Sequence, residues 1–175
     1  KLIDGTAEAV RLLNEAGYKV IVITNQAGVA RGYYTEADVK ILHDYMNEVL
    51  GRDGAHVDAF YYCPHHPEHG IGIYKKKCHC RKPETGMFEM AERDLPGGID
   101  KAHSYMIGDK RIDAQAGKNF GVTGVLVGTG YGAKEHAEDM AAGLIKEDGS
   151  CPVGGYDAYA DTLLDAVRGI LDGRI

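Results

Sequence analysis

The sequence predicts an α/β protein built on a doubly wound parallel sheet, and two observations carry that prediction. Short apolar, β-branched runs alternate along the chain with longer amphipathic segments, which is the order of parallel strands joined by crossover helices. The runs are almost unbroken in hydrophobicity, as expected for strands covered on both faces. A chain of 175 residues is long enough for one such domain and short for two. We therefore expect a single domain over residues 1–175.

The first segments begin the alternation. Residues 6–16 repeat apolar side chains with the helical period, placing Ala7, Val10 and Leu13 on one face, and a glycine follows directly. Residues 19–24, KVIVIT, form a short β-branched run. These two segments predict a helix that leads into a buried parallel strand.

A second helix and a second strand come next. We expect Thr35 to be the N-cap of the helix, with Asp38 three residues later completing a capping box. Residues 57–63, VDAFYYC, read as the following strand. The apolar stripe of the helix is predicted at Val39, Leu42, Met46, Val49 and Leu50.

The second half of the chain continues in the same order. The stretch over 128–156 is rich in glycine, and we expect it to be irregular. The other predicted elements are a helix over 86–95, a strand over 104–109, a helix over 111–120, a strand over 121–127, and a last amphipathic helix that uses Leu163, Leu164, Val167, Ile170 and Leu171.

Composition excludes several classes of function. The formal net charge is −6, which argues against a nucleic-acid-binding protein but allows an anionic small-molecule substrate bound by a few local cations. No run approaches about 18 consecutive apolar residues, and no basic-then-apolar leader opens the chain. We therefore expect a cytoplasmic protein, most simply a monomer, with no membrane partner.

The segment over 61–87 concentrates the metal-binding residue types. Cys63 and His65 form one close pair and Cys78 and Cys80 another, which is the ligand chemistry of a tetrahedral structural zinc site. With four protein ligands no coordination position stays open, so we predict a structural Zn²⁺ that folds a loop over 63–80. Further candidates in the same segment are His66, His69 and His79, while Cys151 stands apart as a free thiol.

Polar clusters follow the predicted strands. They are Thr24-Asn25, Arg81-Lys82 after the cysteine loop, and Asp109-Lys110. Ligands of doubly wound sheets bind outside the carboxyl ends of the strands. A hydroxyl, an amide, cations and a carboxylate suit a phosphate with a Mg²⁺ counter-ion.

Three motifs in this order resemble haloacid-dehalogenase-like phosphatases, and among them the D-glycero-D-manno-heptose 1,7-bisphosphate phosphatases. The motifs are ITNQAGVARG, YYCPHHP…CHCRKPETGM and YMIGDKRIDAQAG. The resemblance runs from about Lys1 to Gly132, and the tail from Ala133 contributes little to it. It implies a Rossmann-like haloacid dehalogenase fold and a Mg²⁺-dependent phosphatase. Such an enzyme would work through an aspartyl-phosphate on a sugar bisphosphate, on the route to ADP- or GDP-heptose and lipopolysaccharide-type polysaccharides.

The resemblance also implies roles for particular residues. Thr24 would hydrogen-bond the transferring phosphoryl group, and Lys82 would neutralise its charge. Arg81 would recognise the substrate, Asp109 would bind Mg²⁺, and Lys110 would reach the substrate. The family pattern uses the first histidine after the proline as zinc ligand, which is His65, and Asp113 would support the site from behind. The substrate site would also be lined by Asn25, Gln26 and Ala27.

One part of the family pattern is not matched. The family's nucleophile and general acid form an Asp-x-Asp at the end of a first strand, but Leu2 stands two residues before Asp4, and leucine cannot attack phosphorus. We therefore expect this chain to be N-terminally truncated, to lack that first strand, and to be inactive by itself.

Two other functions stay open from the sequence. A histidinol-phosphate phosphatase is the near relative, although the twelve residues between His65 and Cys78 resemble the longer loop of the heptose enzymes. A zinc-stabilised binding module that has lost catalysis is the second alternative. The missing Asp-x-Asp favours it, and the presence of Lys82 and Asp109 opposes it.

Overall fold

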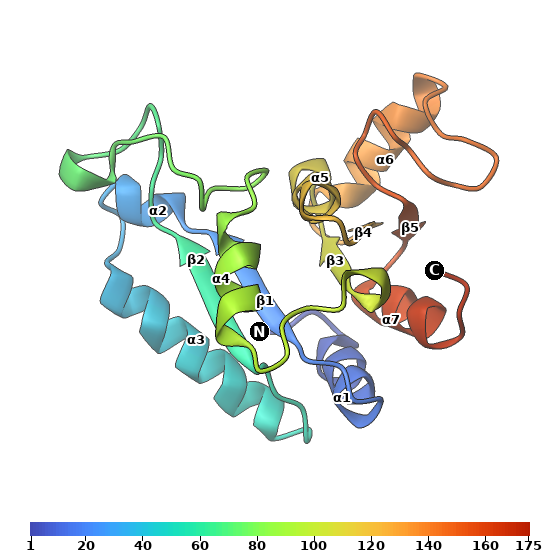
Figure 1. The fold of residues 1–175 in the computed structure, drawn as a ribbon, viewed down its shortest axis with the longest axis horizontal. Helices are drawn as coiled ribbons and strands as arrows, with labels where there is room; N and C mark the ends of the chain where they lie inside the picture. Colours follow the sequence, from blue (N-terminus) through green and yellow to red (C-terminus); the bar gives the residue numbers. More distant parts are fainter. The chain divides into compact units, whose positions relative to one another are not determined.

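The computed structural model describes residues 1–175. The chain forms two compact units, one of residues 10–98 and one of residues 1–9 with 99–175. Each unit has its own parallel sheet and its own helices (Figure 1). The division falls inside the first helix, α1 (Thr6–Glu15). The predicted α/β class with parallel strands is confirmed.

The sheet of residues 10–98 pairs β1 (Ile21–Asn25) with β2 (Ala59–Cys63) in parallel. Thr24 lies opposite Tyr62 and Asn25 opposite Cys63, so the carboxyl ends of both strands coincide. Each strand starts two residues later than predicted from its apolar run. This register places Thr24 and Asn25 next to Cys63.

Helices cover both faces of this sheet because side chains of a strand alternate between its faces. On one face Phe60 stacks on His43 of α3 (Glu36–Gly51), with ring centroids 4.4 Å apart. On the other face the Tyr61 hydroxyl donates to Asp94 of α4 (Gly86–Asp94) at 3.2 Å. Two short helices, α2 (Ala27–Ala30) and the 3₁₀ helix η1 (Gly72–Tyr74), lie in the loops.

The start of α3 is as predicted, but its buried face is not. Thr35 caps the helix and shares a complete capping box with Asp38. Leu42, expected in the apolar stripe, is 50% exposed, whereas His43 is buried. His43 follows Val39 by one helical turn, so the two share a face. A histidine that stacks on an aromatic ring belongs to the core, and an apolar-stripe argument overlooks it.

The sheet of the other unit has the order β3 (Tyr105–Gly108), β4 (Thr123–Val127) and β5 (Ala158–Ala160), all parallel. The central strand β4 alternates between two cores. Leu126 packs with Cys151 and Tyr156. Val125 and Val127 pack on the opposite side, with Ala160 and Ala166. Both clusters include residues of this one strand, so β4 contributes buried apolar side chains to the cores on both faces of the sheet.

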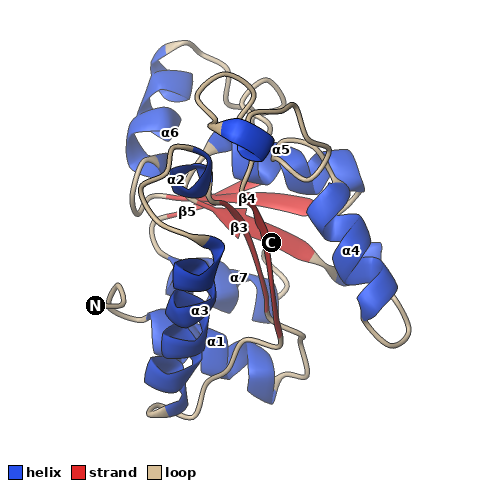
Figure 2. Ribbon diagram, turned by 90° about the vertical axis from the view of Figure 1, so that its left-hand side faces the viewer, coloured by secondary structure: helices blue, strands red, loops and turns tan.

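Helices flank this sheet as well. The helix α5 (Arg111–Phe120) packs on β3 and β4, and α7 (Leu163–Leu171) packs on β4 and β5. Figure 2 shows these strands in red between the two helices. A one-turn 3₁₀ helix, η2 (Lys101–His103), precedes β3. No helix of the structure combines the length and the apolar character needed to cross a membrane.

The prediction of an irregular segment over 128–156 is wrong in part. Residues Gly132–Ala141 form α6. Its cap residue Tyr131 makes no side-chain cap hydrogen bond, so the usual sequence signal for a helix start is missing. Within α6 the buried positions are Gly132 and Asp139. The helix is stabilised by tertiary contacts such as that of Asp139 with Arg111. Its sequence has no apolar stripe from which a helix could be predicted.

Candidate active site and metal centre

The four predicted zinc ligands lie together at the end of β2. One ligand atom from each of Cys63, His65, Cys78 and Cys80 lies within 4.8 Å of all the others. The Cys63 and Cys80 sulfurs are each 3.7 Å from His65 Nδ1, and the Cys78 and Cys80 sulfurs are 2.8 Å apart. Cys63 is fully buried.

This group fits a zinc ion. Zinc takes thiolate sulfur at about 2.3 Å and imidazole nitrogen at about 2.0–2.1 Å in a tetrahedron, which separates neighbouring ligand atoms by roughly 3.5–3.8 Å. The two sulfur–nitrogen distances of 3.7 Å meet that requirement, whereas the Cys78 and Cys80 sulfurs, 2.8 Å apart, would have to separate by about 1 Å to bind the same ion. Four protein ligands close the coordination sphere, so a zinc ion held here has a structural role and does not activate water.

The loop between the ligands is fastened to the first turn of α3. The Glu36 carboxylate accepts hydrogen bonds from the hydroxyls of Tyr62 on β2, at 2.7 Å, and Tyr74 of η1, at 2.8 Å. These hydroxyls, Tyr62 first, lower the pKa of Glu36. The carboxylate in turn raises the pKa of Tyr62 to about 12. One charged group thus joins helix, strand and loop.

Lys82 is buried at the end of the same loop. It is 7% exposed, and its Nζ donates to the backbone oxygen of Ile23 on β1 at 2.9 Å. Its backbone N–H donates to Asn25 Oδ1 at 3.0 Å, and its backbone oxygen accepts from Asn25 Nδ2 at 3.3 Å. Arg81 donates from its guanidinium to the backbone oxygen of His65 at 3.1 Å. Both cations are therefore attached to the strand ends.

The segment after β1 is ordered by Gln26. Its backbone N–H donates to the backbone oxygen of Cys63 at 2.8 Å, and its side chain donates to Thr24 Oγ1 at 3.2 Å. The Tyr34 hydroxyl donates to Gln26 Oε1 at 2.7 Å. Ala27 is the first residue of α2. The structure thus gathers six predicted site residues in residues 10–98, namely Thr24, Asn25, Gln26, Ala27, Arg81 and Lys82.

Asp109 and Lys110 follow β3 in the other unit. Asp109 Oδ2 accepts the backbone N–H of Tyr131 at 3.1 Å, and Lys110 Nζ lies 4.2 Å from the centroid of the Tyr131 ring. Gly130 has φ of 64°, and a Cβ there would collide with the Asp109 carboxylate. Glycine is therefore required where the loop after β4 approaches Asp109. Carboxylate oxygens are ligands that Mg²⁺ prefers.

Asp113 is on α5, and its side chain lies against Gly108, the residue before Asp109. It is 8% exposed, and a Cβ on Gly108 would collide with its side chain. Asp4 precedes α1, is almost fully exposed, and pairs with Lys1 at 3.5 Å. A cavity of about 370 Å³ is lined by Asp109, Asp4 and neighbouring residues of the same unit.

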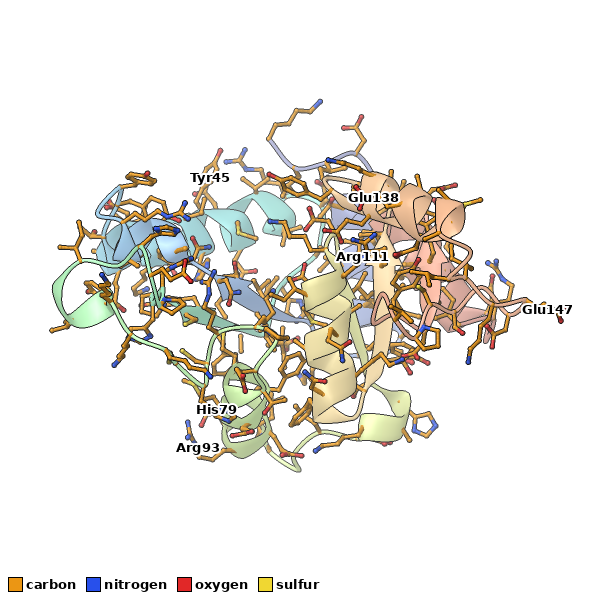
Figure 3. All side chains as sticks on the ribbon, turned by 90° about the horizontal axis from the view of Figure 1, so that it is seen from above. Tyr45, His79, Arg93, Arg111, Glu138 and Glu147 are labelled. Carbon is orange, nitrogen blue, oxygen red and sulfur yellow. The ribbon has the colours of Figure 1, made fainter.

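Arg111 is a residue whose importance the sequence did not indicate. Its Nε donates to Asp139 Oδ2 at 2.9 Å, and a terminal nitrogen lies 3.2 Å from Glu138 Oε2. Asp139 is 4% exposed and also accepts from the Tyr156 hydroxyl at 3.2 Å. Figure 3 labels Arg111 and Glu138, whose side chains lie near each other beside α6. The partners follow Arg111 by 27 and 28 residues and lie on the helix that was not predicted, so no local signal revealed them.

Two comparisons bear on the class of protein. A family model described as HAD-hydrolase-like matches residues 79–148. The solved structure of D,D-heptose 1,7-bisphosphate phosphatase from B. bronchiseptica, complexed with magnesium and phosphate, aligns with a TM-score of 0.76 and 32% identity, over 98% of this chain and 84% of that one. A putative HAD-like phosphatase from Mesorhizobium loti aligns with a TM-score of 0.68 and 34% identity, over 74% and 62%. The fold is that of a haloacid-dehalogenase-like hydrolase.

Sequence relatives define the family more closely. The D-glycero-β-D-manno-heptose-1,7-bisphosphate 7-phosphatase of Haemophilus ducreyi is 45% identical over 143 residues, which cover 81% of this chain and 77% of the relative. The enzyme of the same name from Vibrio cholerae is 44% identical over 142 residues, covering 81% and 75%. The chain therefore belongs to the family of heptose bisphosphate phosphatases, and the resemblance drawn from its three motifs is confirmed.

Proposed function

We propose that this chain acts in the Mg²⁺-dependent hydrolysis of the 7-phosphate of D-glycero-D-manno-heptose 1,7-bisphosphate. The observation that carries the proposal is the arrangement at the ends of β1 and β2. There a hydroxyl at Thr24 and cations at Arg81 and Lys82 are fixed within one unit of a chain of this family. That set of groups matches the charge and hydrogen-bonding needs of a phosphate ester.

The proposed chemistry divides the charged groups by role. Lys82 donates to the oxygens of the transferring phosphoryl group, where negative charge is redistributed in the transition state, and Thr24 adds a neutral hydrogen bond. Arg81, with a planar fork of donors, binds a more remote acceptor on the substrate. Asn25, Gln26 and Ala27 belong to the same pocket, and the first of them is treated further below.

Asp109 is the proposed Mg²⁺ ligand, and Lys110 is proposed to reach the substrate. The metal supplies Lewis-acid polarisation of the phosphoryl oxygens when bound. Asp109 presents its carboxylate at the end of β3 with one oxygen already fixed by the Tyr131 backbone. Asp113 supports this position from α5.

The reaction breaks the bond between phosphorus and the oxygen on carbon 7. In the family mechanism the phosphoryl group passes to a carboxylate, and water then releases it as inorganic phosphate, leaving the heptose 1-phosphate. We do not assign Asp4 as that carboxylate, because the position two residues before it is Leu2. The product would serve the formation of an activated heptose for polysaccharide synthesis.

We further propose that Cys63, His65, Cys78 and Cys80 hold a structural Zn²⁺. Its role is to close the loop that ends at Arg81 and Lys82, since Cys80 directly precedes them. None of the four cysteines of the chain forms a disulfide, which suits a reducing cytoplasm. We propose a cytoplasmic monomer, which light scattering coupled to size-exclusion chromatography tests.

The proposed substrate is tested by a comparison of two phosphate esters. The full-length protein is assayed with Mg²⁺ on D-glycero-D-manno-heptose 1,7-bisphosphate and on histidinol phosphate, with phosphate release as readout. We expect kcat/KM to be at least about 100-fold higher for the heptose ester, because remote contacts of the second phosphate contribute to transition-state binding. Preference for histidinol phosphate, or no hydrolysis of either ester, would contradict the proposal.

A further inference from the structure

Three asparagines make the same pair of hydrogen bonds to the backbone of a distant residue. In each pair Oδ1 accepts the N–H and Nδ2 donates to the carbonyl oxygen of a single partner. Asn14 pairs with His56 at 2.9 and 3.2 Å, and Asn47 pairs with Val57 at 2.7 and 3.0 Å. Asn25 pairs with Lys82 at 3.0 and 3.3 Å. Such a two-point contact fixes both the position and the rotation of the partner's backbone.

The partner distinguishes Asn25 from the other two. Asn14 and Asn47 hold residues of the segment that leads into β2, while Asn25 holds the buried cation at the end of the metal loop. The Lys82 side chain returns to the same strand, because Nζ donates to the backbone oxygen of Ile23. The backbone of Lys82 is thus bonded to Asn25 and its ammonium to Ile23, which are the two neighbours of Thr24 on β1.

We propose that Asn25 is a positioning residue, whose side-chain amide holds the Lys82 backbone so that the ammonium lies at the end of β1. Both polar atoms of the amide hydrogen-bond to Lys82, so we assign the side chain to holding Lys82 and not to the direct substrate contact expected from the sequence. The inference rests on the role of Lys82 in the proposed function.

The Cys/His group and the Asn25 amide both hold Lys82, the first by positioning the whole loop and the second by positioning a single residue. The metal centre closes the loop two residues before it, at Cys80, and brings the segment to the strand ends. The Asn25 amide then sets the last residue of that segment in register with β1. A displacement of about 1 Å at a reacting group can cost a factor of about 10² in rate, so removal of the amide is expected to lower catalysis even when zinc stays bound.

The test uses Asn25→Ala with Asn47→Ala as matched control, because both variants remove the same two hydrogen bonds at partly buried sites. In the full-length protein we expect Asn25→Ala to lower kcat by about tenfold or more and to change KM less, because Lys82 interacts with the phosphoryl group in both states but more strongly in the transition state. Asn47→Ala should lower the melting temperature but leave kcat within about twofold. Zinc content is measured for both.

A double variant separates positioning from a general structural effect. If Asn25 acts through Lys82, then Asn25→Ala combined with Lys82→Ala should be no slower than Lys82→Ala alone. Independent, additive losses would overturn the proposal. So would a raised KM with unchanged kcat in Asn25→Ala, since that result indicates direct substrate binding. Asn25→Asp, which keeps the size and the acceptor but loses the donor, provides a second variant in case Asn25→Ala does not fold, and wild-type kcat in it would also overturn the proposal.

Binding of inorganic phosphate with Mg²⁺ gives a readout that needs no turnover. Calorimetry should show weaker phosphate binding in Asn25→Ala and in Lys82→Ala, with no further loss in the double variant. This result supports the positioning role even if the heptose ester proves not to be the substrate. Unchanged phosphate affinity in Asn25→Ala, with a loss in Lys82→Ala, would overturn it while leaving the proposed function intact.

Discussion

Lys82 and Asp109, the charged residues at two strand ends, are held by different means in their two units. Lys82 depends on distant parts of the chain, through the Cys/His group and the Asn25 amide. Asp109 depends on close backbone approach, through Gly130 and the Tyr131 N–H. Beside it, Arg111 is bound to α6 through a buried carboxylate. The comparison indicates that the first site is sensitive to metal and thiol chemistry and the second to packing of the tail.

Loss of the metal should have the largest effect on phosphate binding. It should act through the Lys82 site and leave the Asp109 site unchanged. Cys78→Ser replaces a soft ligand by a hydroxyl, so we expect the wild-type content of about one zinc per chain to fall towards zero. Phosphate binding should weaken with it, because the loop that carries Arg81 and Lys82 is no longer closed. Metal analysis and calorimetry measure both.

Cys151→Ser is the matched control for the metal. Cys151 is buried in the other unit, where Gly154 donates its N–H to the sulfur at 3.2 Å, so this variant should keep its zinc. Full zinc content in Cys78→Ser, or no zinc in wild-type protein purified without chelators, would contradict the assignment. Added zinc should not replace Mg²⁺ in catalysis.

The contribution of tail packing near Asp109 is tested at the ion pair between Arg111 and Asp139. Asp139→Ala removes a carboxylate that is 6% exposed in its side chain and leaves Arg111 without that partner, so we expect a loss of roughly 3 kcal/mol in the free energy of unfolding. Glu138→Ala removes a half-exposed carboxylate from the same guanidinium, and should cost less than about 1 kcal/mol. Urea unfolding compares the two. Equal losses would show that burial does not set the strength of this contact.

Arg81 should affect substrate binding more than the chemical step. One terminal nitrogen of its guanidinium donates to the His65 backbone, and we expect the remaining N–H donors to orient a remote substrate group. We expect Arg81→Ala to raise KM by about tenfold with kcat changed less. Arg93→Ala, an exposed arginine on α4, serves as control and should show wild-type kinetics. A fall in kcat alone for Arg81→Ala would assign it to the transition state instead.

A small pH effect is expected at Glu36. The two tyrosine hydroxyls lower its pKa in the folded protein, so the ionised form is favoured by folding. This contribution is present above the carboxyl's unfolded pKa of 4.5 and is lost as pH falls through the lower folded value. Because the group is partly exposed, the effect should stay below about 1 kcal/mol.

Glu36→Gln measures this effect, since glutamine still accepts a hydrogen bond but does not ionise. Wild type should lose more unfolding free energy than Glu36→Gln between pH 7 and pH 3 in urea titrations. An identical loss in both proteins would show that Glu36 contributes nothing to the acid sensitivity.

What the sequence could predict depends on the range of the interaction. The capping box of Thr35 and Asp38 spans three residues and was predicted exactly where the structure has it. The four metal ligands were predicted as a group because their residue types are rare and paired in sequence. The alternation of strands and helices was predictable because amphipathic helices and buried strands have different spacings of apolar residues.

Interactions that join distant residues were not predicted. The Arg111–Asp139 pair spans 28 residues, and α6 has no capping side chain or apolar stripe to announce it. The partner of Asn25 lies 57 residues away, so the sequence indicated a polar residue at a strand end but not which atoms it would bind. His43 was missed because its core contact is with a ring on another element.

The central claim is that the metal loop places Lys82 to stabilise the transferring phosphoryl group. It is tested most directly by kcat of full-length wild type and Lys82→Ala on D-glycero-D-manno-heptose 1,7-bisphosphate with Mg²⁺, in folded, zinc-loaded protein. We predict a fall of about 10² or more, equivalent to at least about 2.7 kcal/mol of lost transition-state stabilisation. A kcat within about twofold of wild type would make Lys82 an ordinary buried cation and contradict the account.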